Sequence, residues 1–447
     1  MEIRDTITLL ENLNKPVIAE GLDLAKAHLT HPEDLVVKQG AHGIGNALKI
    51  MTTTVKKPHE ITVKWDGSPA LIFGVGQDGK FRILDKHMFN KADDSGRNVT
   101  SPKAFAQYDI NRGVDRGTLP QAVSNMWTSL KAACGGQPGY YWGDMLFGDK
   151  LVPQGDLLVF KANPTGLTYK VDVNSDVGQM MLGKLAGIAV HQFIPVDAHE
   201  KANQANQQAA EQGEKGKYAA TDFAESLNGS LGKLKVPANS KVAIVPSKMP
   251  ITPTLDKNNW ELYSKKVAND ASQLAQSIDA FVALGDIKGL NASYNNEFHA
   301  WLESYINSEI RNIKPDMGPE DKESILSKVG AAFPTYVTGR IAKINEKPLK
   351  LPKAIEERQR NQAVLLNHIK TNNKGMINTY RMWYELYKLK MMIYGQINTT
   401  AKDLPVKGFI DPNSEEESQE GFVAHGVKYV DRAGFSAANL GGQRSGR

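Results

Sequence analysis

The residue best placed to do chemistry is Lys64, which begins the segment Lys-Trp-Asp-Gly-Ser-Pro-Ala (64–70). The preceding residues, 61–63, alternate in polarity and predict a strand, so the lysine would be held at a strand end ahead of an Asp-Gly turn. Lysine attacks as a nucleophile only when neutral, which requires desolvation or neighbouring cations to lower its pKa. The alternative is a surface hairpin with a solvated lysine and Trp65 packed beneath it.

Three further segments carry residue types that bind phosphate or metal. The segment 140–148 predicts an aromatic strand that carries one acid, Asp144. Near the other end of the chain, Glu420 leads into an apolar strand, and the strand after it carries Lys428. Taken singly, Glu420 is typical of a turn acid and Lys428 of a solvated strand lysine. The order of the four segments is more specific than any one of them.

Together these segments resemble the motifs of the covalent nucleotidyltransferases, the superfamily of ATP-dependent DNA and RNA ligases and mRNA-capping enzymes. The motifs of that family are, in order, Lys-x-Asp-Gly, Gly-Glu among apolar residues, Glu-Gly-x-Val, and a lysine-bearing strand. All four occur here in order, the second with Asp144 in place of glutamate. The resemblance covers residues near 55–195 and 415–440, and it is closest to a phage-type RNA-ligase-like protein.

The resemblance implies a catalytic role for three residues. Lys64 would attack the α-phosphate of ATP and hold AMP as a phosphoramidate, and Asp66 and Gly67 complete its motif. Lys428 would contact the α-phosphate. Glu420 would bind Mg²⁺ or its water shell, which suits an ion that is usually held by one or two carboxylates, phosphates and waters.

The resemblance also implies contacts with the rest of the nucleotide. Thr62 falls where the family's backbone meets the base, and Asp144 falls at the contact with a ribose hydroxyl. Lys86, at the end of the predicted strand 80–85, is the candidate for the ribose and phosphate, with Arg82 as the weaker candidate.

An aromatic side chain that stacks on the base usually lies between the acidic motifs. Phe160 and Phe193 both lie on predicted strands in that interval. Phe160 is our candidate, and the sequence leaves Phe193 open as its alternative.

Two features favour RNA as the substrate. Many DNA ligases carry arginine two residues after the motif glycine, where this chain has Pro69. DNA ligases and capping enzymes also continue into an OB-fold, whereas fewer than twenty residues follow Arg432, too few for a five-stranded barrel. We therefore expect an ATP-dependent RNA ligase that transfers AMP to a 5′-phosphate. A DNA ligase without an OB-fold, a capping-type guanylyltransferase, and an inactive nucleotide- or nucleic-acid-binding scaffold stay open.

The composition is compatible with this function without indicating it. The chain has 447 residues, a net charge of +5 and one cysteine, Cys134, which excludes an intramolecular disulfide and fits a reducing cytosol. No apolar run is long enough to span a bilayer, so we expect no membrane partner. We expect a cytoplasmic protein, in the host cytoplasm if it is phage-encoded. Protein partners are not indicated.

The predicted fold class is α+β. A nucleotidyltransferase domain with mixed or antiparallel sheets would be preceded by helices and interrupted by a large helical bundle, whose apolar residues recur at helical spacing. The expected parts are an N-terminal helical segment (1–55), the first part of the nucleotidyltransferase domain (56–198), a linker or extension (199–254), the bundle (255–400) and the second part of the domain (401–447). The basic faces of the bundle helices would either contact phosphate or be solvated.

Overall fold

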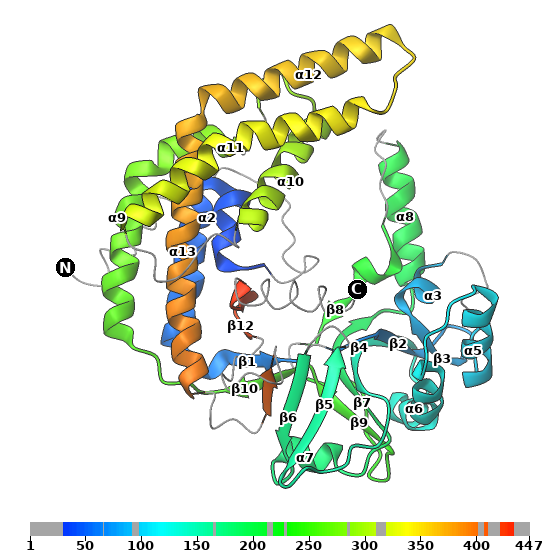
Figure 1. Cartoon of the computed structure of the whole chain (residues 1–447). Helices are drawn as coiled ribbons and strands as arrows, with labels where there is room; N and C mark the ends of the chain where they lie inside the picture. The colour runs from blue at the N-terminus through cyan, green and yellow to red at the C-terminus, as the bar shows by residue number, and fades with distance from the viewer. Residues whose placement is uncertain are drawn as a thin grey trace.

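The computed structural model describes residues 30–65, 67–91, 98–163, 167–211, 218–227, 230–283, 287–309, 319–400, 406–409 and 421–432. The fold is α+β, as expected: a helical bundle stands on one side and three largely antiparallel sheets on the other (Figure 1). Among the described helices, none is long and apolar enough to cross a membrane.

The bounds of the elements are as follows. The strands are β1 (Ile61–Lys64), β2 (Ala70–Val75), β3 (Phe81–Asp85), β4 (Gly139–Phe147), β5 (Leu157–Asn163), β6 (Leu167–Asp172), β7 (Ala186–Ile194), β8 (Glu225–Ser226), β9 (Val242–Pro246), β10 (Lys248–Ile251), β11 (Val406–Phe409), β12 (Phe422–Ala424) and β13 (Val427–Tyr429). The α-helices are α2 (Leu35–Lys56), α3 (Lys86–Asn90), α5 (Pro102–Asn111), α6 (Leu119–Cys134), α7 (Asp176–Met181), α8 (Ala198–Glu211), α9 (Lys257–Val282), α10 (Ala292–Glu309), α11 (Pro319–Asn345), α12 (Pro352–Thr371) and α13 (Asn373–Thr400). The short 3₁₀ helices are η1 (Pro32–Asp34), η2 (Pro58–Glu60) and η3 (Ala220–Phe223).

Two of the sheets are joined where the chain passes directly from a strand of one sheet to a strand of the other sheet. The first sheet has the order β10-β1-β12-β13, and the second runs β3-β2-β4-β7-β8 with β9 parallel to β7. The chain therefore crosses between them twice, from β1 to β2 and from β9 to β10. The crossings are tied together by Ser247, whose carbonyl accepts from the Trp65 N–H at 3.0 Å and whose N–H donates to the Val190 carbonyl at 2.9 Å. A third sheet, β11-β6-β5, packs beside this junction.

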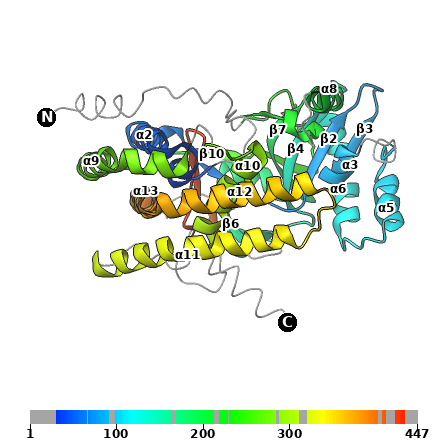
Figure 2. The same cartoon turned by 90° about the horizontal axis from the view of Figure 1, so that it is seen from above.

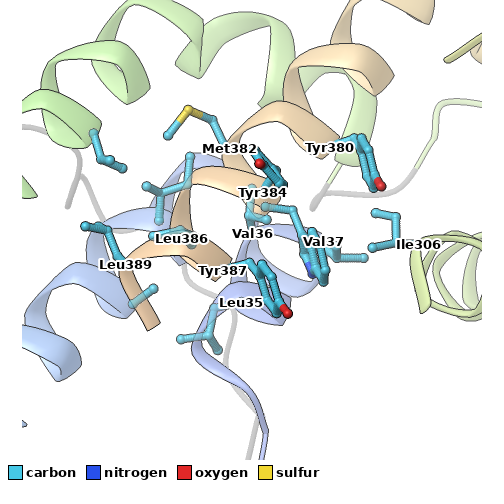
Figure 3. Packing of buried hydrophobic residues seen from close by; sticks show 14 of the residues in the cluster. Leu35, Val36, Val37, Ile306, Tyr380, Met382, Tyr384, Leu386, Tyr387 and Leu389 are labelled. Atoms are coloured by element: carbon cyan, nitrogen blue, oxygen red, sulfur yellow. The ribbon is translucent and has the colours of Figure 1, made fainter. Parts of the chain in front are cut away.

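The helical bundle and the first sheet share one core. The long helices α2, α9 and α13 lie side by side in both views (Figures 1 and 2). Figure 3 shows how apolar side chains of α2, α10 and α13 meet there. On α13, Trp383 stacks against Tyr380 and Tyr387 at centroid distances of 5.9 and 5.6 Å, since residues three and four apart share a helix face. Ile61 and Val63 of β1 extend the same core into the sheet.

The predicted strands and the helical character of 255–400 are observed. The strands that the sequence predicts at 60–65, 69–75, 80–85, 139–146, 156–161, 167–173 and 186–194 all form, and the described residues of 255–400 contain five α-helices. The segment 31–35, with proline in its first turn, predicts a helix start, and Pro32 begins η1 there; Gly40, expected to break the helical pattern, has a φ of 59° and interrupts α2. The expected helical residues before 30 lie outside the described part of the chain.

Two parts of the fold differ from expectation. The composition of 199–217 allows an exposed helix or a mobile linker, and α8 forms there, but the expected linker or extension 199–254 also contributes β9 and β10 to the second and first sheets. The helices α5 and α6 were not expected, although α6 packs Leu119, Val123 and Met126 into the core of the second sheet.

Candidate functional site

The strand β1 lies in the centre of the first sheet and carries Lys64 at its end. Lys64 is the register partner of Lys248 on β10. Two residues earlier, Thr62 is the partner of Val423 on β12, and Val423 is in turn the partner of Lys428 on β13. The backbone positions of all three lysines therefore fall on one small sheet. The side chain of Lys64 lies outside the described part of the structure.

Alternation along these strands separates a core face from a second face. Val63, Phe422 and Tyr429 are buried and belong to the core shared with the bundle. Successive residues of a strand take opposite faces, so positions 62, 64 and 428 have the parity of the face away from that core. Lys428 is half-buried there, and its backbone N–H donates to the Thr30 carbonyl at 3.0 Å.

Thr62 is held by its neighbouring strands. Its Oγ1 donates to the Val423 carbonyl at 3.1 Å, and its backbone lies between β10 and β12. Its expected contact with the base stays a prediction.

The turn after Lys64 packs tightly against β4. A Cβ on Gly67 would lie 2.4 Å from the Met145 carbonyl oxygen and 3.2 Å from the Cβ of Asp144. The next residue, Ser68, donates its N–H to the carbonyls of Met145 at 3.0 Å and Ala162 at 2.8 Å. An Asp-Gly turn usually needs glycine for a backbone conformation that a side chain would resist, but Gly67 does not have a positive φ, so that reason does not apply here. Glycine is needed because two backbones approach each other closely.

Asp144 begins a row of polar and aromatic side chains on the second sheet. Its Oδ1 lies 3.5 Å from Nε2 of His191. The His191 ring lies 5.5 Å from that of Trp142, and the Lys86 ammonium lies 5.1 Å from the Trp142 ring centroid. The structure therefore brings Asp144 and Lys86, two of the predicted nucleotide contacts, close to the Gly67 turn.

An open pocket of about 410 Å³ adjoins Lys86. Of the described residues, Lys86, His87, Asn90 and Lys91 line it, all on or beside α3. Both polar atoms of the Asn90 side chain bond to Thr221, which fixes α3 against η3. The lining has no acidic member among the described residues, and such a surface suits an anion.

Arg82 lies away from the site. It is at the opposite end of β3 from Lys86, where its Nη2 pairs with Asp78 at 2.7 Å. This ion pair closes the β2–β3 hairpin, and it holds the pKa of the Asp78 carboxyl well below its usual range. Of the two candidates, Lys86 lies beside the Trp142 ring, whereas Arg82 lies at the far end of β3 in an ion pair.

Phe160 lies within the core of the third sheet. It is 6% exposed, and its ring packs against those of Trp65, Phe147 and Tyr169 at 6.4, 5.4 and 5.6 Å. A ring packed on these sides offers a base little surface, so the structure favours a packing role for Phe160. The alternative, Phe193, is half-buried against Tyr141 at 5.3 Å.

Two predicted site residues, Asp66 and Glu420, lie outside the described residues. Gly421, which follows Glu420, is described. A Cβ there would lie 2.4 Å from Cγ2 of Val430, so this position also requires glycine. Because Val63 is the partner of Phe422, the register continued by one step sets Gly421 opposite Lys64. Within the described ranges, no three acidic, histidine or cysteine side chains form a group that could hold a metal ion.

A buried charged cluster that no sequence pattern indicated lies beside Lys428. Lys390 is completely buried and pairs with Glu33 at 2.5 Å, while Arg432 contacts Glu33 at 3.2 Å and Asp34 at 2.7 Å. Burial lowers the pKa of Lys390, and Glu33 opposes that shift. These residues come from η1, α13 and the segment after β13, and residues this far apart in sequence carry no shared pattern.

One protein family matches residues 26–444, and it is described as a family of unknown function (DUF6267). No curated protein and no solved structure matches the chain. The match runs through both halves of the candidate site and through the helical bundle between them. Because it covers most of the sequence, the chain belongs to the family of unknown function DUF6267.

Proposed function

We propose that this protein is an ATP-dependent polynucleotide ligase that acts on RNA through a lysyl-AMP intermediate on Lys64. The observation that carries the proposal is the meeting of separate motifs at one junction. The strand with Lys64 leaves the first sheet at Gly67, which packs on Asp144 of the second sheet. Lys428 lies two strands from Thr62 in the same register. In this proposal the two joined sheets are the nucleotidyltransferase domain.

The proposed reaction has three steps. The Lys64 amine forms a bond to the α-phosphorus of ATP, and the bond to the β-phosphate breaks as pyrophosphate leaves. A 5′-phosphate oxygen then takes AMP from the lysine, and a 3′-hydroxyl attacks that phosphate and releases AMP. Lysines at positions 248 and 428 would favour a neutral Lys64 and stabilise negative charge. Mg²⁺, held by phosphate oxygens and Glu420, would neutralise charge on the leaving pyrophosphate.

The first prediction concerns the covalent intermediate. The purified protein, incubated with Mg²⁺ and ATP, should gain the mass of AMP, and Lys64→Ala should not. Intact mass spectrometry measures this, with pyrophosphatase present and prior adenylation excluded. The control is Lys56→Ala, which removes an exposed lysine at the end of α2 and should leave the adduct intact.

A different result in this experiment would assign the protein to a different class. A GMP adduct from GTP would move the assignment to a capping-type enzyme. No adduct from either nucleotide would exclude the ligase mechanism and leave a binding scaffold. If the AMP adduct forms, joining of RNA ends should exceed joining of nicked duplex DNA, and the reverse preference would make the protein a DNA ligase.

A further inference from the structure

The helices α11 and α12 form a hairpin that concentrates the positive charge of the chain. From Arg340 on α11 to Thr371 at the end of α12 there are eight lysines and arginines against three glutamates, a net charge of +5, which equals the charge of the whole chain. The remainder of the protein is therefore close to neutral. The modest net charge of the whole chain therefore does not reveal that this part of the hairpin is strongly basic.

The cations at the turn of this hairpin are exposed, and none has a carboxylate partner among the residues that the structure describes. Lys347, Lys350 and Lys353 point to solvent, and in the described part of the chain none of them forms an ion pair. Some surface cations elsewhere on the bundle are paired, such as Lys388 with Glu385 at 2.7 Å. An unbalanced cluster costs self-repulsion, which an anionic partner would relieve.

The turn itself is held rigidly. Nη1 of Arg358 on α12 donates to the carbonyls of Lys347 at 2.9 Å and Ile344 at 3.4 Å, where α11 ends. Asn345 and Gln362 bond across the hairpin at 2.8 Å. The Arg358 guanidinium is therefore hydrogen-bonded within the hairpin, whereas the three lysines are exposed on the turn that these bonds hold in place.

Apolar side chains are exposed between these lysines. Leu351 is 70% exposed, and Leu349 and Ile355 are 37% and 38% exposed. Cations next to apolar surface suit a single strand, whose phosphates and unstacked bases are both accessible, better than a duplex that hides its bases.

The hairpin projects toward the side of the molecule that holds the sheets. In Figure 1 the turn between α11 and α12 stands above α8, away from the bundle axis. Figure 2 shows the same hairpin extending from the bundle toward the end with α3 and α6. A strand bound along it would approach the candidate site from the bundle side.

We infer that the α11–α12 hairpin is an arm that binds the phosphate backbone of a single-stranded polynucleotide. The identity of this partner rests on the proposed ligase function. The arm supplies affinity through Lys347, Lys350 and Lys353. It takes no part in formation of the lysyl-AMP bond.

The test is fluorescence anisotropy of a labelled single-stranded RNA with the full chain. The arm variant combines Lys347→Ala, Lys350→Ala and Lys353→Ala. Its binding should weaken on the order of tenfold at moderate salt, and the slope of log K against log salt should flatten by about 2, since each phosphate contact on a single strand contributes about 0.7. The matched control, Lys49→Ala with Lys257→Ala and Lys266→Ala, removes three exposed lysines from α2 and α9 and should bind like the wild type.

Measurement of the AMP adduct on the same samples separates the two proposals. The arm variant should form as much adduct as the wild type. The arm assignment is overturned if the RNA affinity and salt slope of the arm variant match those of the control. It is also overturned if the wild type forms the adduct but does not bind RNA. In either case, an AMP adduct on the wild type would leave the proposed nucleotidyl transfer standing. Loss of RNA binding in the arm variant, with no adduct in any protein, would support the arm and reject the ligase.

Discussion

At the scale of single residues, Gly67 offers the most direct test of how Lys64 is positioned. A methyl group there would meet the Met145 carbonyl at 2.4 Å, and β4 backbone cannot retreat without disturbing its pairing with β2 and β7. We predict that Gly67→Ala lowers the free energy of unfolding by about 1–3 kcal/mol and reduces adenylation. Urea unfolding followed by tryptophan fluorescence measures the first effect, because Trp65 beside the turn is fully buried.

The control is Gly339→Ala on α11. No atom lies within 4 Å of the added methyl group, so helix propensity should stabilise this variant by up to about 1 kcal/mol. A harmless Gly67→Ala would mean that the turn does not need its close contact with β4. The sequence predicted that Gly67 matters through its motif, but the reason is a contact with β4, far along the chain. A tertiary contact of that kind leaves no local pattern.

At the scale of elements, the buried charges after β13 connect the Lys428 strand to the bundle. Arg432 pairs with Glu33 and Asp34, and its guanidinium also lies 5.8 Å from the Trp383 ring. We predict that Arg432→Met destabilises the protein by about 3–5 kcal/mol, because it removes the ion-pair partner of the buried Asp34 carboxylate and leaves Glu33 paired with Lys390 alone. Hydrogen exchange across residues 421–432 should accelerate, including the Lys428 amide.

An exposed ion pair provides the contrast. Lys201 and Asp197 on and before α8 lie 3.1 Å apart with both side chains 43% exposed, so Lys201→Met should cost less than about 1 kcal/mol and leave exchange in 421–432 unchanged. Equal protection of β13 in the Arg432→Met protein would show that strand pairing alone holds Lys428.

Sequence periodicity predicted individual strands well and their partners poorly. The alternation within 61–63 marked β1, and the apolar and aromatic residues within 69–75 and 139–146 marked β2 and β4, because strand-forming composition is a local property. It did not show that β1 and β2 belong to different sheets, or that β10 lies beside Lys64, because register depends on contacts across the fold. The expected linker concealed β9 and β10 for the same reason.

At the scale of the whole molecule, the bundle is part of the same structure as the site. Apolar residues of α2, α9 and α13 form one core with β1, β12 and β13. The sequence suggested an inserted bundle and a separate N-terminal segment, because stripes on helices show which face is buried without showing what covers it. Any condition that loosens this shared core should therefore also disturb the site.

Acidic pH should loosen this core, and substitution of His31 allows the effect on the free energy of unfolding to be measured. Burial, with Lys390 and Arg432 nearby, lowers the pKa of His31 to about 2. Burial also lowers the pKa of His368, which bonds the Phe281 carbonyl of α9 at 2.8 Å, and that of His425 between β12 and β13. The unfolded chain therefore takes up these protons first, and the free energy of unfolding falls as the pH drops below about 6.5, by at most about 1.4 kcal/mol per pH unit for each histidine.

Urea unfolding between neutral and mildly acidic pH should show a shallower decline in the free energy of unfolding for His31→Asn than for the wild type. His59→Asn, which replaces an exposed ring, should keep the wild-type decline. Equal declines in all three proteins would mean that His31 accepts a proton without unfolding, and that the junction of η1, α13 and β13 is open to water.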